Sequence, residues 1–405
     1  MKTSIADEVL ETPQGSVADQ VLRSCVHCGF CNAACPTYQI LGEELDGPRG
    51  RIYLMKSVIE GNAVTRRTQA HLDRCLTCQA CETSCPSGVE YHRLLNVGRK
   101  IVDAKVGRRW HELLYRWMIR KLLVVPSRFS RSLALARMFR PMLPRTLRSH
   151  IPPEPAASSF PRVHAERGML FLDGCVQPVL APNINSAAAR VLAKLGIELQ
   201  QTAGAGCCGA LSYHLNAQAE GLAFARRNVD AWWPKLEDGA EAIVTTASGC
   251  GAFIKQYGDL LEYDEQYREK ARRVQRAARD ISEVLAAEGV ASLKVGAQKR
   301  VAFHCPCTLQ HGQALAGLTE KLLRELGFEL TPVADSHLCC GSAGAYSLLQ
   351  KELSARLLEN KISALQAEQP EEILTANIGC QQQLSTATQR PVRHWIELVD
   401  ENMEP

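Results

Sequence analysis

Two runs of cysteine near the N-terminus share the spacing C-x2-C-x2-C-x3-C-P. Their members are Cys25, Cys28, Cys31 and Cys35 in the first run, and Cys75, Cys78, Cys81 and Cys85 in the second. In proteins with this spacing, three thiolates of one short loop bind one [4Fe-4S] cluster and the fourth cysteine binds a neighbouring cluster. We therefore predict two clusters with crossed ligands. The first would bind Cys25, Cys28, Cys31 and Cys85, and the second Cys75, Cys78, Cys81 and Cys35.

Zinc sites and disulfides are alternative uses of these cysteines, and the sequence favours neither. Structural zinc sites normally take two close pairs of cysteines, whereas each run here has four cysteines within eleven positions. Disulfides are typical of exported proteins. The N-terminal segment MKTSIADEVLETPQGS is polar and lacks the apolar core of a signal peptide, so we expect the chain to stay in a reducing cytosol.

Residues 99–148 carry an excess of positive charge. They include fourteen Lys or Arg residues and two acidic residues, whereas the net charge of the whole chain is +4. Apolar side chains recur in this segment at helical spacing, namely Trp110, Leu113, Leu114, Trp117 and Met118. Charged side chains fall on the other side of the same helix, namely Arg109, Glu112, Arg116 and Arg120. The pattern predicts a basic amphipathic helix.

Three roles of this helix stay open. It can lie on an anionic membrane surface, dock a partner subunit, or pack its apolar stripe inside this chain. Nucleic-acid binding is less favoured, because no DNA- or RNA-binding motif accompanies the charge. No stretch of the sequence approaches the roughly twenty apolar residues of a membrane span. Any membrane contact is therefore expected to be peripheral.

The C-terminal part of the sequence repeats a second pattern of cysteines. Its first copy contains Cys175, Cys207, Cys208 and Cys250, and its second copy contains Cys307, Cys339, Cys340 and Cys380. The first three cysteines of each copy match at one offset of 132 residues, and the last pair matches at 130. Three matches at a single offset indicate a duplicated unit of about 130 residues, a typical domain size.

Apolar runs and helical periods alternate within each copy. Strands are expected at residues 169–172, 242–246, 301–303 and 373–375, and helices at 184–196, 222–233, 318–327 and 347–365. Such alternation predicts parallel α/β units with the cysteines at strand ends. The first 98 residues lack strand signals, contain helical patterns at 50–61 and 65–75, and include a probable turn in DGPRGR. The expected fold is a multi-domain α+β chain, with an N-terminal helical ferredoxin-like domain followed by two duplicated α/β domains.

The second set of thiols has three open roles, which are metal ligation, catalytic thiol chemistry and structural packing. Cys305 adds a further thiol in the second copy alone. A G-x-G-x-x-G match at residues 204–209 is rejected as a dinucleotide site, because the second copy keeps its cysteines and loses its first two glycines. No flavin or nicotinamide signature appears elsewhere, so hydride chemistry is expected on another subunit.

Several histidines lie near cysteines or turns, namely His27, His214, His304, His337 and His394. Lone histidines are usually structural. His304 and His337 lie close to Cys305 and Cys339 in the sequence and could hydrogen-bond cluster sulfur, which tunes the reduction potential.

Several stretches outside the cluster motifs carry a family resemblance. They are LDGPRGRIYLMK, TASGCGAF, FHCPCTLQH, DSHLCCGSAG, TANIGC and VRHWIE. Together with SCVHCGFCNAACPTY and DRCLTCQACETSCPSGVEYH, they resemble the iron-sulfur subunits of glycolate oxidase over nearly the whole chain. The duplicated units resemble the CCG cysteine-rich domains of that family. The fullest CCG pattern ends in C-x2-C, but Ala247 and Asn377 stand at the first of those positions here.

The resemblance implies a complex in which partner subunits carry FAD or FMN and oxidise glycolate to glyoxylate. This chain would hold two [4Fe-4S] clusters and pass electrons to a respiratory acceptor, a quinone, while lying peripherally on the cytoplasmic side of the inner membrane. It would be inactive on glycolate by itself. A further cluster or metal in the CCG domains is left open, and the thiols concerned are Cys175, Cys207, Cys208, Cys250, Cys305, Cys307, Cys339, Cys340 and Cys380.

Two alternative functions remain at this point. The first is the iron-sulfur subunit of a lactate or glycerol-3-phosphate dehydrogenase, and the second is a thiol or quinone reductase like heterodisulfide reductase. The expected domains are 1–98 for the two-cluster domain, 99–165 for the basic helical segment and linker, and 166–296 and 297–405 for the two CCG domains.

Overall fold

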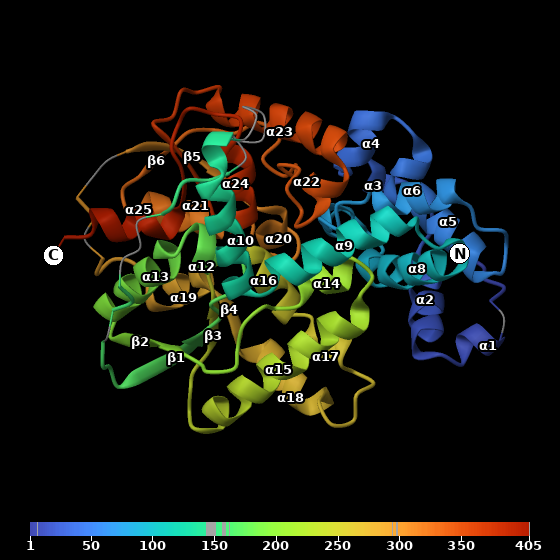
Figure 1. Ribbon diagram of the computed structural model, residues 1–405, viewed down its shortest axis with the longest axis horizontal. Coiled ribbons are helices and arrows are strands. Elements are labelled where there is room, and N and C mark those ends of the chain that lie inside the picture. Colours follow the sequence, from blue (N-terminus) through green and yellow to red (C-terminus); the bar gives the residue numbers. More distant parts are fainter. Residues whose placement is uncertain are drawn as a thin grey trace.

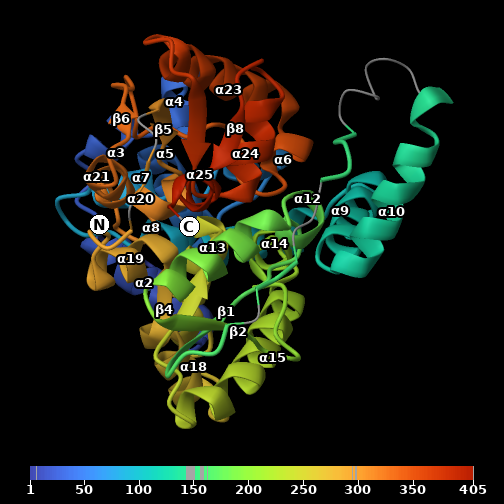
Figure 2. The same cartoon turned by 90° about the vertical axis from the view of Figure 1, so that its left-hand side faces the viewer.

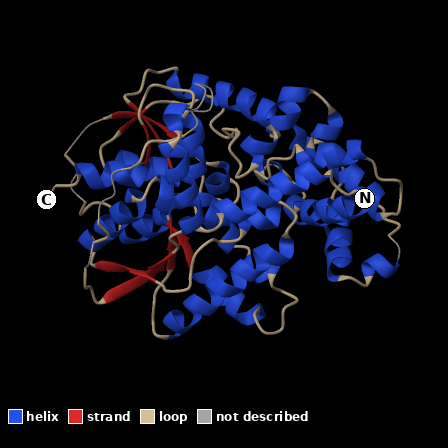
Figure 3. Ribbon diagram, viewed as in Figure 1, coloured by secondary structure: helices blue, strands red, loops and turns tan. Residues whose placement is uncertain are grey.

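The computed structural model describes residues 1–5, 7–142, 151–155, 159–161, 163–293, 295–296 and 299–404. Figure 1 shows the N-terminal helices at one end of the molecule and the two repeated units at the other. Figure 3 shows that the strands form two separate groups, both away from the N-terminal helices. The helical and α/β parts predicted from the sequence are thus confirmed as separate regions.

The N-terminal region is built from short helices around two cysteine loops. Its helices are α1 (Asp7–Leu10), α2 (Pro13–Ser24), α3 (Phe30–Ala33), α4 (Pro36–Leu41), α5 (Pro48–Ile59), α6 (Arg66–Asp73), α7 (Ala80–Thr83) and α8 (Tyr91–Val106), with a 3-10 turn η1 (Glu44–Asp46). Helices α2, α5 and α6 pack on α8. Their core includes Leu22, Met55 and Leu94, which are fully buried. Gly98 permits this packing, because a Cβ there would lie 2.6 Å from the side chain of Met55.

The DGPRGR segment differs from the turn that the sequence predicts. Pro48 begins α5, where proline is favoured because the first helical N–H has no partner in the helix. Gly50 lies in the first turn of α5, and a Cβ at that position would approach the carbonyl oxygen of Glu44 to 2.1 Å. The glycine therefore serves the close approach of η1 to α5, and the expected turn is confined to Gly47.

Each repeated unit is a four-stranded parallel sheet with flanking helices. In the first unit the strands are β1 (Arg167–Phe171), β2 (Ile197–Gln201), β3 (Ile243–Thr245) and β4 (Ala278–Asp280), and in the second they are β5 (Arg300–His304), β6 (Glu329–Leu330), β7 (Glu372–Thr375) and β8 (Val392–His394). The strand orders are β2-β1-β3-β4 and β6-β5-β7-β8. Arg167 pairs with Ile197 and Ile243 with Ala278 in the first sheet. The same order in both sheets confirms the duplication, and we call the two units the first and second modules.

The helices of the modules follow the same order. The first module has α12 (Gln177–Leu180), α13 (Asn183–Lys194), α14 (Ala210–His214), α15 (Gln218–Glu237), α16 (Ser248–Ile254), α17 (Tyr257–Leu260), α18 (Arg268–Ala277) and α19 (Ile281–Glu288). The second has α20 (Cys307–Gln310), α21 (Leu318–Glu325), α22 (Tyr346–Leu349), α23 (Lys351–Gln366), α24 (Ile378–Ser385) and α25 (Trp395–Asn402). The helices predicted at 184–196, 222–233 and 318–327 correspond to α13, α15 and α21, and the one predicted at 347–365 is divided between α22 and α23.

Equivalent helices of the two modules form the contacts across their interface. Helix α13 of the first module packs on α25 of the second, and α19 packs on α21. One apolar core runs through both pairs and includes Leu192, Leu285, Leu323 and Leu398, all fully buried. The modules therefore form one packed body with approximate twofold symmetry.

The basic segment folds into a helical hairpin between the N-terminal region and the first module. It consists of α9 (Trp110–Leu123), α10 (Pro126–Met138) and a 3-10 turn η2 (Arg140–Met142). Figure 2 shows α9 and α10 together on one side of the molecule, with α10 outermost. Among the described residues, no helix combines the length and apolar character needed to cross a bilayer.

Candidate functional site

The first set of predicted ligands surrounds a small cavity in the N-terminal region. This cavity is lined by Cys25, Cys28, Cys31 and Cys85, together with Cys81. The loop turns sharply because His27 and Gly29 adopt positive φ angles of 62° and 88°. Alternating left-handed residues bring successive thiols of a short loop to one side. Cys85 arrives from the second run, as the crossed arrangement requires.

The second set surrounds a neighbouring cavity in the same way. Its lining includes Cys35, Cys75, Cys78 and Cys81. Thr77 and Gln79 stand at the positions equivalent to His27 and Gly29, and they too have positive φ angles, of 55° and 61°. The two runs therefore share one loop geometry. The structure brings together both predicted sets, and the assignment of each thiol as a ligand stays a prediction.

Buried polar groups surround the second set. The guanidinium of Arg51 is buried, with Nη1 4.0 Å from Cys35 Sγ and Nη2 donating to Thr37 Oγ1 at 3.1 Å. The hydroxyl of Tyr91 donates a hydrogen bond to Cys75 Sγ at 3.7 Å. A buried cation and a hydroxyl donor both favour negative charge on sulfur.

Burial governs the protonation of these thiols. It raises the pKa of Cys31 to about 11, with the nearby thiol of Cys25 adding to the effect. Burial also raises the pKa of Cys78 and of Cys81 well above the usual thiol value. Metal ligation requires thiolates, so cluster assembly at these sites must release protons.

The four thiols of the first module come together in one group, each beside another of the four. Cys175 and Cys208 hydrogen-bond to Cys207 and lower its pKa well below the usual value, and Cys208 also hydrogen-bonds to Cys250. Gly209 follows the paired cysteines with a φ of 95°. A Cβ at this glycine would approach the carbonyl oxygen of Gly221 to 2.4 Å, so only glycine fits the turn.

The second module repeats this convergence. Cys307 Sγ lies 3.9 Å from Cys339 Sγ, and Cys340 hydrogen-bonds to Cys380. Gly341 has a φ of 84° and occupies the position of Gly209. A left-handed glycine therefore follows the cysteine pair in both modules. By contrast, Cys305 is buried in the core shared by the two modules.

The histidines differ in their surroundings. His394 accepts a hydrogen bond from the N–H of Ile396 as the N-cap of α25 and donates to Thr246 O at 2.8 Å, so its role is structural. His27 Nε2 donates to Arg49 O at 3.3 Å beside the first cavity. His304 is buried, and in the described part of the chain neither of its ring nitrogens has a hydrogen-bond partner. His214 is half-buried at the wall of a larger cavity, and desolvation of the ring lowers its pKa to about 4.

That larger cavity has a volume of about 930 Å³ and lies where all parts of the molecule meet. Its lining includes seven thiols of the modules, namely Cys175, Cys207, Cys208, Cys250, Cys307, Cys339 and Cys380. The hairpin contributes Leu123, Phe129 and Leu133, and the second cysteine run contributes Cys75. We call this space the central cavity. Its size and apolar lining are typical of a small-molecule site.

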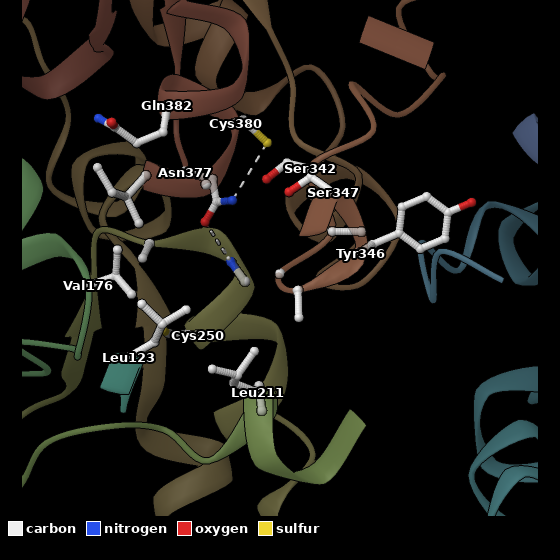
Figure 4. A pocket seen from close by; sticks show the side chains of 18 of the residues that line it. Leu123, Val176, Leu211, Cys250, Ser342, Tyr346, Ser347, Asn377, Cys380 and Gln382 are labelled. Atoms are coloured by element: carbon white, nitrogen blue, oxygen red, sulfur yellow. Dashed lines mark hydrogen bonds between the residues drawn. The ribbon is translucent and has the colours of Figure 1, made fainter. Parts of the chain in front are cut away.

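Asn377 connects the two modules at the wall of the central cavity. Figure 4 shows its side chain between Cys380 and the first module. Its amide Nδ2 donates to Cys380 Sγ at 3.6 Å, and its Oδ1 accepts from Gly249 N at 3.4 Å. Asn377 stands where the fullest CCG pattern has a cysteine, so an amide donor replaces a thiol ligand beside Cys380.

The second cysteine set lies against the second module. Cys78 and Leu76 pack with Cys307 and Cys339 in one cluster. Tyr346 of that cluster donates its hydroxyl hydrogen to Arg74 O at 3.1 Å. The second cavity therefore lies between the first cavity and the thiols of the second module. The sequence carries no signal for this contact, because it joins residues more than 200 positions apart.

Helix α9 has its apolar stripe on the outside. Trp110 and Trp117 are 75% and 50% exposed. The charged side faces the protein, where Arg116 pairs with Asp73 at 3.5 Å and Arg120 with Glu220 at 3.0 Å. The interpretation in which the stripe packs inside this chain is therefore wrong.

Family models match the same regions. A 4Fe-4S dicluster domain covers residues 21–89, and a CCG cysteine-rich domain matches twice, at 169–255 and 301–385. The glycolate oxidase iron-sulfur subunit of Escherichia coli is 53% identical over 405 residues, which is all of both chains. The chain belongs to the family of glycolate oxidase iron-sulfur subunits.

Other proteins are similar to this chain at lower identity. The probable glycolate oxidase iron-sulfur subunit of Bacillus subtilis is 30% identical and covers 91% of this chain and 89% of its own. Lactate utilization protein A of Bacillus licheniformis is 26% identical over 51% of this chain and 85% of its own. A hypothetical protein from Helicobacter pylori shares the fold, with a TM-score of 0.50, 9% identity, and coverage of 97% of this chain and 72% of its own.

The cysteine geometry fits the two clusters of this family. Each N-terminal cavity offers four thiols with space between them, and buried donors face the second. The dicluster match ends before the predicted boundary at residue 98, and both CCG matches lie inside 166–296 and 297–405. The exact domain limits stay predictions.

Proposed function

We propose that this chain is the electron-transfer subunit of a flavin-dependent complex that oxidises glycolate to glyoxylate. Clusters bound at the two N-terminal cavities supply one-electron transfer. The observation that supports this function best is the order of the sites. One cavity is near the surface at the exposed Cys28, and the other lies against the thiols of the second module.

The surface beside the first cavity suits a flavoprotein partner. Val26 and Phe30 are exposed large apolar residues on the loop of the first cysteine run, and Tyr53 is exposed nearby on α5. Apolar and aromatic side chains are enriched in the cores of protein interfaces. We infer that FAD- or FMN-binding subunits dock here, because this surface gives the shortest electron-transfer distance to the first cavity.

The central cavity suits the acceptor. It lies between the second cysteine set, the module thiols and the hairpin. Its apolar lining from α9 and α10 fits the ring of a quinone, and those helices carry the exposed apolar stripe. We infer that the stripe rests on an anionic membrane surface and that quinone reaches the central cavity from there. This placement is peripheral, on the side of the membrane that carries the flavoprotein.

The test compares the chain alone with the chain bound to its flavoprotein partners. The anaerobically purified chain should contain about eight irons and show no glycolate turnover. In the assembled complex, glycolate should bleach the visible absorbance of the clusters, whereas lactate and glycerol 3-phosphate should bleach it more slowly. Glycolate turnover by the isolated chain, or faster bleaching by glycerol 3-phosphate, would contradict the proposal. Disulfide reduction by the isolated chain would favour the thiol-reductase alternative.

A further inference from the structure

His304 is an uncompensated polar group in the core of the second module. It ends strand β5 and is 2% exposed. Neither Nδ1 nor Nε2 has a hydrogen-bond partner among the residues that the structure describes. Burying an imidazole without partners costs free energy, and buried polar groups without partners are rare in folded proteins. Burial, with the positive charge of Lys361 nearby, lowers the pKa of His304 to about 3 and so keeps the ring neutral.

Two buried thiols face this ring. One ring nitrogen of His304 and the Sγ atoms of Cys340 and Cys380 all lie within 4.8 Å of one another. The three residues come from separate elements, which are the end of β5, the loop before α22 and the first turn of α24. Asn377 donates its amide hydrogen to Cys380 Sγ, a contact that favours the thiolate.

The described residues of the first module form no such site, although its backbone is equivalent. The offset of 132 residues places Leu172 at the position of His304. Leu172 is buried and packs with Cys208 in an apolar cluster. The duplicated scaffold therefore accepts an aliphatic side chain at this position. The imidazole of the second module is not required by the fold.

We propose that His304, Cys340 and Cys380 bind one zinc ion. A neutral imidazole and two thiolates are typical zinc ligands, and together with Zn²⁺ they carry no net charge, which suits a buried position. Zinc bonds of about 2.0–2.3 Å at tetrahedral angles place ligand atoms about 3.5–4 Å apart. Small side-chain rotations bring the three atoms to that spacing.

The geometry distinguishes this site from the cluster sites. The thiols of each N-terminal set surround a cavity, whereas the three ligand atoms here converge on one point. Cys380 also lines the central cavity, but His304 and Cys340 lie behind its wall. The fourth position of the ion would therefore face the central cavity and take a water molecule. The inference does not depend on the proposed electron-transfer function.

The test measures zinc and iron in the full-length chain by mass spectrometry after anaerobic purification and equilibration with zinc alone. The unmodified chain should hold one zinc ion besides about eight irons. His304→Leu introduces the residue that the first module has at this position, and this variant should lose the zinc while keeping the irons. Cys340→Ser should have the same effect. His337→Gln is the matched control and should keep both metals. Iron content and visible absorbance report whether each variant has folded.

Cobalt gives a second readout. Co²⁺ at a site with two thiolates should produce a charge-transfer absorption that is absent in His304→Leu and in His304→Gln. A chain that takes up no zinc would overturn the proposal, and so would zinc that persists in both His304 variants. Additional iron that is lost in Cys340→Ser would also overturn it, in favour of a third cluster.

Discussion

At the scale of single residues, identical cysteine motifs stand in different surroundings. The second set has the buried Arg51 beside Cys35 and the Tyr91 hydroxyl on Cys75. Beside the first set, Arg49 is partly exposed and pairs with Glu44 at 2.6 Å. Buried positive charge and hydrogen bonds to sulfur favour the reduced, more negative cluster. We therefore expect the second set to have the higher reduction potential.

Replacing Tyr91 with phenylalanine tests this difference. Tyr91→Phe keeps the buried ring and removes one hydrogen bond to Cys75 Sγ. The loss of about 1 kcal/mol should lower one reduction potential by roughly 40 mV for a one-electron couple. A potentiometric titration followed by EPR measures both centres. Tyr53→Phe, on the exposed ring near the first set, is the control and should shift neither potential.

Single serine substitutions test the crossed ligands. Cys35→Ser should alter the same centre as Tyr91→Phe, because Cys35 lines the second cavity although it belongs to the first run. Cys85→Ser should alter the other centre, since it lines the first cavity. EPR of each variant, combined with Tyr91→Phe, identifies the affected centre. If Cys35→Ser and Tyr91→Phe acted on different centres, the crossed assignment would be wrong.

At the scale of elements, α9 reverses the usual arrangement of an amphipathic helix. A surface helix normally buries its apolar side. Here Arg120 and Lys121 both pair with Glu220, and Arg116 pairs with Asp73, so ion pairs hold the charged side on the protein. Apolar residues of α10 such as Leu135 and Met138 are also exposed. Arg128 and Arg131 of α10 are exposed as well, so the hairpin presents apolar side chains together with these cations outward, as membrane-surface helices do.

Two tryptophans of α9 provide the test of membrane binding. Trp110→Gln with Trp117→Gln should weaken binding to vesicles of phosphatidylethanolamine and phosphatidylglycerol. A loss of about 1–2 kcal/mol per side chain lowers the affinity at least about tenfold. Vesicle co-sedimentation of the full complex measures it.

Tyr263→Gln is the control for this experiment, because Tyr263 is exposed between α17 and α18, away from the hairpin. Binding should also weaken in high salt if the exposed arginines contact lipid phosphates. Unchanged vesicle affinity in the double tryptophan variant would instead favour a protein partner on this surface.

At the scale of the whole molecule, the two modules share one core. The packing of α13 on α25 and of α19 on α21 buries apolar side chains of both modules together. Arg190 of α13 also pairs with Asp400 of α25 at 2.6 Å. Because neither module can complete this core alone, we expect them to unfold together.

A substitution that creates a cavity in the shared core tests this cooperativity. Leu398→Ala should lower the free energy of unfolding by about 2–5 kcal/mol. Both modules should still unfold in a single transition, at a lower temperature. Calorimetry of the full chain, with tryptophan fluorescence from Trp232 and Trp395 as module probes, measures the effect. Leu365→Ala, in a core of the second module only, should shift the same single transition. Two separate transitions would show that the modules are independent.

Local chemistry made much of this molecule predictable. Cysteine spacing defines loop geometry over about ten residues, and a constant offset defines a duplicated backbone, so both cluster loops and both modules follow from the chain itself. The apolar runs at 169–172 and 301–303 were predicted as strands because nearly all their residues are apolar. The edge strands β4, β6 and β8 were missed, because their short sequences ARD, EL and VRH contain too few apolar residues to form a pattern.

The sequence by itself determined which residues can hold clusters, which units repeat and which helix is amphipathic. Only the tertiary structure decided which side of α9 faces outward, that Cys78 packs beside Cys307, and that His304 meets two thiols without a hydrogen-bond partner. Spacing along a chain specifies geometry within a loop or a helical turn. Orientation and convergence depend on distant partners, such as Glu220 for Arg120, whose positions are set only when the modules pack.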